Sequence, residues 1–213
     1  MEEKLIKTGT TTIGIVCKDG IVLAADKRAS AGYLIANRKQ EKIQKISDEM
    51  AITQAGLVSD AQLLTKVIKA QLSLEELKRK KKPSVKEAAN LLAGLLYQNI
   101  RQMSMVPGIV GFLLGGVDRT GFYLYDLGVD GSATFLEDFG STGSGSVVAY
   151  GVLETLFKKD MTVNDGIKLA AKAINASIKR DMPTGDGLDV FTITRRGVNK
   201  VLTKEIDIKL SNS

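Results

Sequence analysis

The N-terminal quarter of the chain carries short blocks of apolar and β-branched residues, a pattern typical of β-strands. Two β-rich runs, residues 10–18 and 20–27, are separated by Asp19 alone and predict a tight hairpin around Asp19 and Gly20. Three shorter runs predict further strands at residues 33–37, 42–46 and 50–54. The chain therefore begins with a series of strands.

The pattern then changes to a helical period. One apolar stripe at helical spacing covers residues 57–72, and a second covers residues 88–100. Pro83 separates the two stripes, and Ser84 followed three residues later by Glu87 has the spacing of a capping box. These features predict two consecutive helices, the second beginning after Ser84.

The second half of the chain repeats this order. The pattern predicts strands at 110–117, 121–126 and 133–137, a glycine-rich segment at 140–146, helices at 147–157 and 163–179, and closing strands at 190–195 and 200–203. Helices that come in pairs, and not singly between strands, argue against a doubly wound parallel sheet. We expect an α+β fold in which two sheets lie between two helical layers.

Composition narrows the chemistry that the chain can perform. Its 213 residues fit one large domain with an ample core. The sequence contains no histidine, which excludes Ser-His-Asp and Cys-His hydrolysis and any histidine-ligated metal. The single cysteine, Cys17, excludes a disulfide framework and a cysteine-based zinc site, and suits a reducing compartment. We expect no cofactor, and any hydrolytic base must be an amine, a carboxylate or a bound water.

The formal net charge of +6 raises the question of nucleic-acid binding. Its densest run, residues 78–82, lies where a predicted helix ends, and cations there complement the helix C-terminus. Aromatic residues are few and are not interleaved with the basic ones, which weakens the case for base stacking. Residues 1–9 lack the apolar core of a signal peptide, and the apolar run at 108–117 is too short for a bilayer. We expect a soluble cytoplasmic protein without nucleic-acid or membrane partners.

The junction between Gly9 and Thr10 has the features of a concealed N-terminus. Residues 1–9 are charged and unpatterned, whereas the strand pattern starts at Thr10. Cleavage of this bond would leave a threonine whose free α-amine stands beside its own hydroxyl, and such an amine serves as general base for the oxygen. The alternative is that residues 10–12 are an ordinary β-branched strand start.

Motifs along the whole chain resemble the β subunit of the archaeal 20S proteasome. They are, in order, Gly9-Thr10-Thr11-Thr12-Ile13-Gly14, Asp26-Lys27-Arg28, Lys42-Ile43, Ala55-Gly56-Leu57-Val58-Ser59-Asp60, Gly143-Ser144-Gly145-Ser146, Arg180-Asp181 and Gly185-Asp186-Gly187. The family belongs to the N-terminal-nucleophile hydrolases. The resemblance implies a four-layer αββα sandwich, with residues 1–9 as a leader and residues 10–213 as one domain.

The resemblance implies that Thr10 is the nucleophile, exposed by self-cleavage after Gly9, and that Asp26 and Lys42 flank it. A lysine ammonium near the threonine oxygen lowers the pKa of the hydroxyl and stabilises the developing alkoxide, while the carboxylate orients the lysine. In isolation, Asp26 would be interpreted as a partner of Lys27 or Arg28, and Lys42 as a solvated strand residue.

Three further positions match active-site groups of the family, and a fourth position differs from the residue that the family has there. Gly56 matches the backbone oxyanion donor, and Ser144 and Asp181 match the polar groups that tune the α-amine. Thr184 stands where the family leads us to expect serine, and Met182-Pro183 precedes it in place of small polar residues. The alternatives are a strand-to-helix turn at Gly56, and a helix N-terminus capped by Ser144 or Ser146. A phosphate-binding loop there is weak, because no lysine follows at P-loop spacing.

The positions that match the family's primary side-chain pocket are unusually polar. They are Ala29, Gln40, Gln44, Gln54, Val58 and Gln62. Four amides in this set predict weaker cleavage after Leu, Phe or Tyr than in a typical family member. The alternative is that some of these glutamines point away from the pocket.

The resemblance implies a threonine protease that degrades unfolded polypeptides delivered by an ATPase. Its partners would be other β subunits in a heptameric ring and α subunits in adjoining rings. One alternative is a catalytically silent β subunit that keeps its leader and supports an active paralogue. A second is an N-terminal-nucleophile amidohydrolase acting on a small amide.

Overall fold

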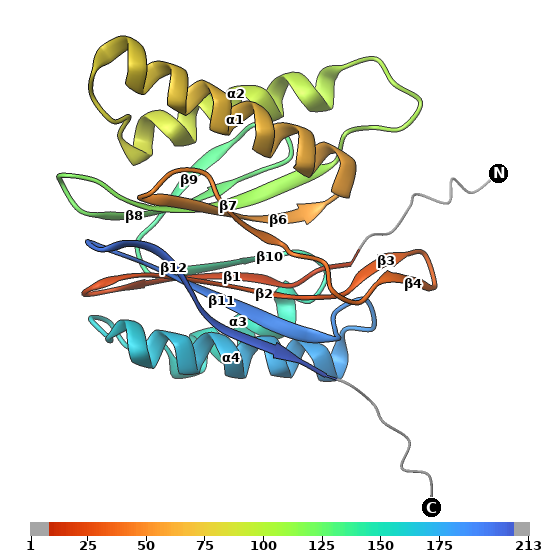
Figure 1. Ribbon diagram of the computed structural model, residues 1–213. Coiled ribbons are helices and arrows are strands. Elements are labelled where there is room, and N and C mark those ends of the chain that lie inside the picture. The colour runs from red at the N-terminus through yellow and green to blue at the C-terminus, as the bar shows by residue number, and fades with distance from the viewer. Residues whose placement is uncertain (1–8, 207–213) are drawn as a thin grey trace, which may run out of the picture.

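Two five-stranded antiparallel sheets lie face to face between two pairs of helices within residues 9–206, the part of the chain that the computed structural model describes (Figure 1). Residues 1–8, which are most of the expected leader, and residues 207–213 lie outside the described residues. The layer order is helices, sheet, sheet, helices, so the expected α+β sandwich of αββα type is confirmed.

The first sheet has the strand order β10-β1-β2-β11-β12. Its strands are β1 (Thr12–Cys17), β2 (Gly20–Asp26), β10 (Phe139–Thr142), β11 (Gly187–Thr194) and β12 (Gly197–Glu205). The helices α3 (Ser146–Leu156) and α4 (Val163–Arg180) cover its outer face. This sheet carries the N-terminal strand and therefore the region of Thr10.

The second sheet has the strand order β5-β6-β7-β8-β9. Its strands are β5 (Ile43–Lys45), β6 (Met50–Gly56), β7 (Val110–Val117), β8 (Phe122–Leu127) and β9 (Ala133–Leu136). The helices α1 (Val58–Arg79) and α2 (Val85–Arg101) cover it, and a small hairpin of β3 (Ala29–Ala31) and β4 (Leu34–Asn37) projects from one end of the sandwich (Figure 1).

Strand β2 shows why the sandwich forms. Val22 and Ala24 pack against the α3–α4 layer, whereas Ile21, Leu23 and Ala25 pack against the facing sheet. Both faces of the strand are thus buried, which explains its unbroken apolar run. Burial of each large side chain such as Leu23 contributes about 1.5–3 kcal/mol.

Local sequence signals explain the hairpin and the helix start. Cys17 pairs with Gly20, so the predicted β1–β2 hairpin turns over two residues, and Asp19 also accepts a hydrogen bond from the Val163 amide at the start of α4. Ser84 and Glu87 form the predicted capping box of α2, with both reciprocal bonds present. The structure therefore confirms both predictions.

The basic run at residues 78–82 closes α1 and is exposed to solvent. Arg79 pairs with Glu75 and Glu87, and Lys82 pairs with Glu49. This agrees with a solvated helix end. Among the described residues, no helix has the length and apolar character needed to cross a membrane.

Two short strands escaped prediction. β10 overlaps the start of the glycine-rich segment at 140–146, for which the pattern predicts no strand, and it pairs with β1 from Thr12 to Ile15. β3 spans only three residues and carries no alternating pattern. Both strands are too short and too poor in large apolar residues for their sequence to signal them; pairing with a neighbouring strand orders them.

Candidate active site

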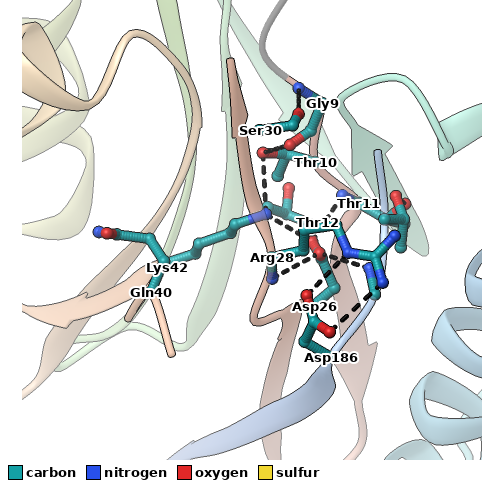
Figure 2. Close-up of polar contacts among 12 residues, drawn as sticks. Gly9, Thr10, Thr11, Thr12, Asp26, Arg28, Ser30, Gln40, Lys42 and Asp186 are labelled. Atoms are coloured by element: carbon teal, nitrogen blue, oxygen red, sulfur yellow. Dashed lines mark hydrogen bonds and ion pairs between the residues drawn. The ribbon is translucent and has the colours of Figure 1, made fainter. Parts of the chain in front are cut away.

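Thr10 lies just before β1 and is 6% exposed. Its Oγ1 donates a hydrogen bond to the carbonyl oxygen of Gly9 at 2.7 Å and accepts one from Lys42 Nζ at 3.1 Å (Figure 2). The hydroxyl therefore lies between the peptide bond that precedes it and a lysine amine. The strand-start interpretation of residues 10–12 is incomplete, because β1 begins only at Thr12.

Lys42 and Asp26 form a buried ion pair. Asp26 ends β2, Lys42 comes directly before β5 of the facing sheet, and their Nζ and Oδ1 atoms lie 2.7 Å apart (Figure 2). Burial lowers the pKa of the Lys42 amine, and the Asp26 carboxylate opposes part of that shift. The interpretation of Lys42 as a solvated residue is wrong, since it is 3% exposed.

Backbone amides complete the coordination of the Asp26 carboxylate. Oδ1 accepts from the Thr11 amide at 3.0 Å, and Oδ2 accepts from the amides of Arg28 and Gly185 at 3.1 and 3.0 Å. These three amides and Lys42 Nζ together satisfy the hydrogen-bonding capacity of the buried carboxylate. The alternative ion pairs are wrong, because Lys27 pairs with Asp189 and Arg28 with Asp186.

A chain of polar groups contacts the backbone nitrogen of Thr10. The Thr10 amide donates to Ser144 Oγ at 3.3 Å, and Ser144 donates to Asp181 at 2.7 Å. Thr184 also donates to Asp181 Oδ2, and its hydroxyl lies 2.7 Å from that of Thr11. The threonine that departs from the expected serine therefore keeps its hydroxyl in the chain, with its side chain buried.

The glycine-rich loop folds around the carbonyl of Thr10. Gly143 has φ +92°, and a Cβ there would lie 2.1 Å from the Thr10 carbonyl oxygen. The Gly145 amide donates to the same oxygen at 3.3 Å. Gly145 is also the N-cap of α3, without a side-chain cap, so the proposal that Ser144 or Ser146 caps this helix is wrong. Ser144 instead bonds Asp181, and Ser146 is already the first residue of the helix.

Gly56 ends β6 with φ +125°, a conformation that side chains with a Cβ rarely adopt. A Cβ there would also lie 2.2 Å from the carbonyl oxygen of Ile109. Glycine is thus required for the strand-to-helix turn. Gly56 and Thr10 line the same pocket, which places its backbone near the candidate nucleophile.

This pocket contains four of the six residues proposed for side-chain recognition. Ala29, Gln40, Gln54 and Val58 line it, together with Gly9, Thr10, Ser30, Lys42 and Gly56. Gln54 donates from Nε2 to the Glu41 carbonyl oxygen at 3.2 Å, so its amide is held in the wall.

The other two proposed residues lie elsewhere. Gln62 is exposed on α1, next to the buried Ala61. Gln44 pairs with Ile52, whose side chain packs in the α1–α2 layer, and opposite residues of an antiparallel pair share a face. The structure does not bring either glutamine into the pocket, so part of the expected polar wall is absent.

Arg28 is a site residue that sequence reasoning did not single out as such. Its guanidinium bonds Asp186 through Nε at 2.7 Å (Figure 2). It also bonds the Met182 carbonyl oxygen through Nη1 at 2.8 Å. It therefore ties the loop that carries Asp181 and Thr184 to the end of β2. Its place two residues after Asp26 was the available signal.

Two facing antiparallel sheets between two helical layers, with Thr10 just before the first strand, agree with the fold of the N-terminal-nucleophile hydrolases. Residues 6–193 match the family model described as proteasome subunit. The chain belongs to the proteasome β-subunit family. Among the described residues, no group of three or more Cys, Asp or Glu side chains is arranged to hold a metal ion.

Relatives named as proteasome subunit beta align over nearly the full length. The protein of Archaeoglobus profundus is 43% identical over 212 residues, covering 100% of this chain and 96% of the relative. That of Methanothermobacter thermautotrophicus is 42% identical over 214 residues, covering 100% and 99%. "Proteasome subunit beta 2" of Aeropyrum pernix is 43% identical over 198 residues, covering 92% and 87%.

Proposed function

We propose that this chain is a catalytic β subunit of the 20S proteasome and hydrolyses peptide bonds with Thr10 as its nucleophile. One observation carries the proposal: the Thr10 hydroxyl contacts both Lys42 Nζ and the Gly9 carbonyl oxygen. Thr10, the residue at the expected cleavage junction, is therefore also the residue whose hydroxyl is hydrogen-bonded to the lysine of the buried Asp26–Lys42 pair.

The first reaction is self-cleavage, in which residues 1–9 act as the leader. While Gly9 is attached, the Thr10 nitrogen is an amide and cannot serve as a base. Lys42 Nζ, which donates to Thr10 Oγ1, stabilises the alkoxide that develops as the hydroxyl gives its proton to a bound water molecule. Oγ1 bonds to the Gly9 carbonyl carbon, and the C–N bond breaks as the Thr10 nitrogen gains a proton. Water then hydrolyses the resulting ester, which releases the Gly9 carboxylate and regenerates the hydroxyl.

The second reaction is hydrolysis of peptide substrates. The freed α-amine of Thr10 becomes the general base for its own hydroxyl. The Ser144–Asp181–Thr184 chain, which contacts the Thr10 nitrogen through Ser144, orients this amine and tunes its basicity. The Gly56 amide stabilises the oxyanion, a contribution of about 3–4 kcal/mol where such a donor has been removed in another hydrolase.

Membership of the family implies assembly with other proteasome subunits. We propose a heptameric β ring beside α rings in the cytoplasm, with unfolded polypeptides delivered by an ATPase. Enclosure in such a particle would keep an unspecific protease away from folded proteins.

The intact mass of the subunit, after assembly with its α-subunit partner, tests the proposal. We expect a mass that begins at Thr10, and a Thr10→Ala chain that keeps its leader. Complete particles in which the wild-type chain still carries residues 1–9 would instead identify the silent structural subunit.

A further inference from the structure

Gly9 is buried and in contact with two side chains that have no assigned part in peptide hydrolysis. Its amide donates to Ser30 Oγ at 3.2 Å (Figure 2). On its other side, a Cβ built on Gly9 would lie 1.7 Å from Cβ of Pro183 and 2.6 Å from its Cγ. Position 9 thus has a hydrogen-bond acceptor on one side and a proline ring on the other, with no room for a side chain between them.

Pro183 is held firmly in this place. The Arg28 guanidinium bonds the carbonyl of the preceding Met182, and the Thr184 amide donates to the Asp181 carbonyl oxygen at 3.1 Å. The pyrrolidine ring also fixes the φ angle of Pro183 itself. Because both flanks of the proline are bonded, the ring cannot move aside to admit a larger residue at position 9.

We propose that Ser30 and Pro183 form a seat for Gly9 that positions the peptide bond for self-cleavage. The seat fixes the Gly9 carbonyl beside Thr10 Oγ1, the 2.7 Å contact from which the attack proceeds. Ser30 and Pro183 are positioning residues of this step, and Pro183 makes the step selective for glycine before Thr10. The inference rests on the proposed self-cleavage and adds to it the residues that select its substrate.

If Pro183 obstructs a side chain at position 9, a second substitution at position 183 should restore leader removal to Gly9→Ala only when it removes the Cβ of residue 183. Alanine at position 183 keeps this Cβ, and glycine removes it. Gly9→Ala should slow leader removal by about 100-fold, the cost of a small misplacement of reacting groups. Gly9→Ala with Pro183→Gly should recover at least about 10-fold of that loss, whereas Gly9→Ala with Pro183→Ala should recover none. Both double variants remove the proline ring, and they differ in the Cβ at position 183 and in the backbone freedom that glycine adds.

Leader removal is followed by intact mass against time after the full chain is mixed with its α-subunit partner. Native mass confirms that every variant enters complete particles. Equal rescue by glycine and alanine, no rescue by either, or normal cleavage of Gly9→Ala would each overturn the seat. A wild-type chain that never loses its leader would instead reject the self-cleavage itself, so the two failures are distinguishable.

The hydrogen bond from the Gly9 amide to Ser30 is tested by a matched pair of variants at position 30. Ser30→Ala should slow leader removal by about 5-fold, the order expected for loss of one hydrogen bond, and Ser30→Thr should restore the wild-type rate because it keeps the hydroxyl. If alanine and threonine behave alike, Ser30 does not position Gly9 through its hydroxyl.

Discussion

Lys42 Nζ lies 2.7 Å from Asp26 Oδ1, and the two residues are 3% and 1% exposed. The residues belong to opposite sheets, so this contact joins the two halves of the sandwich at the candidate active site. Taking two charges out of water is costly, and such a pair is stable only if the remaining hydrogen-bonding capacity is satisfied. Here the carboxylate accepts three backbone amides as well as the lysine.

This arrangement predicts that the two partners are unequal in their effect on stability. Asp26→Ala leaves three buried amides and the Lys42 amine without their acceptor, and should reduce the free energy of unfolding by about 3–5 kcal/mol. Lys42→Met removes one charge-assisted bond from a carboxylate that keeps its amides, and should cost about 1.5–3 kcal/mol. Urea denaturation of the two variants measures both values. A larger loss for Lys42→Met would contradict the predicted asymmetry.

The lowered pKa of Lys42 predicts a pH dependence of stability. Its pKa in the folded protein lies below its ordinary value, so between the two values the unfolded chain binds more protons. The free energy of unfolding contributed by Lys42 should therefore rise with pH through that window, up to about pH 10.4. Below this pH window, Lys42 is protonated in both the folded and the unfolded chain, so its contribution lowers the free energy of unfolding by a constant amount.

The measurement is the difference in unfolding free energy between the wild type and Lys42→Met, followed from pH 7 to above pH 10. Subtraction is needed because burial, with smaller contributions from Asp19 and Asp165, raises the pKa of Cys17 to about 12, which lowers stability as the pH rises above the ordinary thiol value. Cys17 is present in both chains and cancels. If the wild type instead loses stability relative to Lys42→Met as the pH rises, the attraction of Asp26 has a larger effect on the pKa of Lys42 than burial has.

The buried hydroxyl of Thr184 supplies a third prediction. It donates to Asp181 Oδ2 and contacts the hydroxyl of Thr11. Thr184→Val keeps the shape and removes the hydroxyl, and should lower kcat/KM for peptide hydrolysis by about 10- to 100-fold, at or below the contribution of a general base. Thr184→Ser keeps the hydroxyl and should remain within about 2-fold of the wild type. Equal activity of the valine and serine variants would remove Thr184 from the proton chain.

The ion pair also shows how far the sequence alone could go. Hydrophobic patterning predicted a strand at residues 20–27, which is continuously apolar from Ile21 to Ala25, and a shorter strand at residues 42–46. It could not pair the two residues, since their contact depends on how the sheets face each other. Local reasoning favoured Lys27 or Arg28 as partners, and both bond other carboxylates. The pairing was expected only from the resemblance to a known family.

Contacts of glycines were harder still to predict from the sequence. The sequence marked the junction between Gly9 and Thr10 as a concealed N-terminus, but the contact of Gly9 with Pro183 joins residues far apart in the chain. The glycine-rich segment at 140–146 shows no strand pattern, yet β10 overlaps its first residues and pairs with β1, the strand that begins two residues after Thr10. Such contacts leave no periodic signal, because they depend on the absence of a side chain at one position and on the surface of a distant one.

Gln54 provides the last prediction, on specificity. It lies in the pocket beside Thr10 with its amide bonded to the Glu41 carbonyl oxygen, so it presents a polar side chain where an apolar substrate residue would bind. We expect weak cleavage after Leu, Phe or Tyr by the wild type. Gln54→Leu should raise kcat/KM for a fluorogenic peptide with Leu before the cut by about 10-fold, the order expected for burying an apolar side chain against an apolar wall.

Gln62→Leu is the matched control, since Gln62 is exposed on α1 and does not line the pocket. This variant adds the same apolar group outside the pocket and should leave the kcat/KM for the Leu peptide unchanged. An equal gain in both variants would show that the effect does not come from the pocket. A wild type that already prefers large apolar residues would mean that the Gln54 amide, held against Glu41, presents its carbon chain to the substrate.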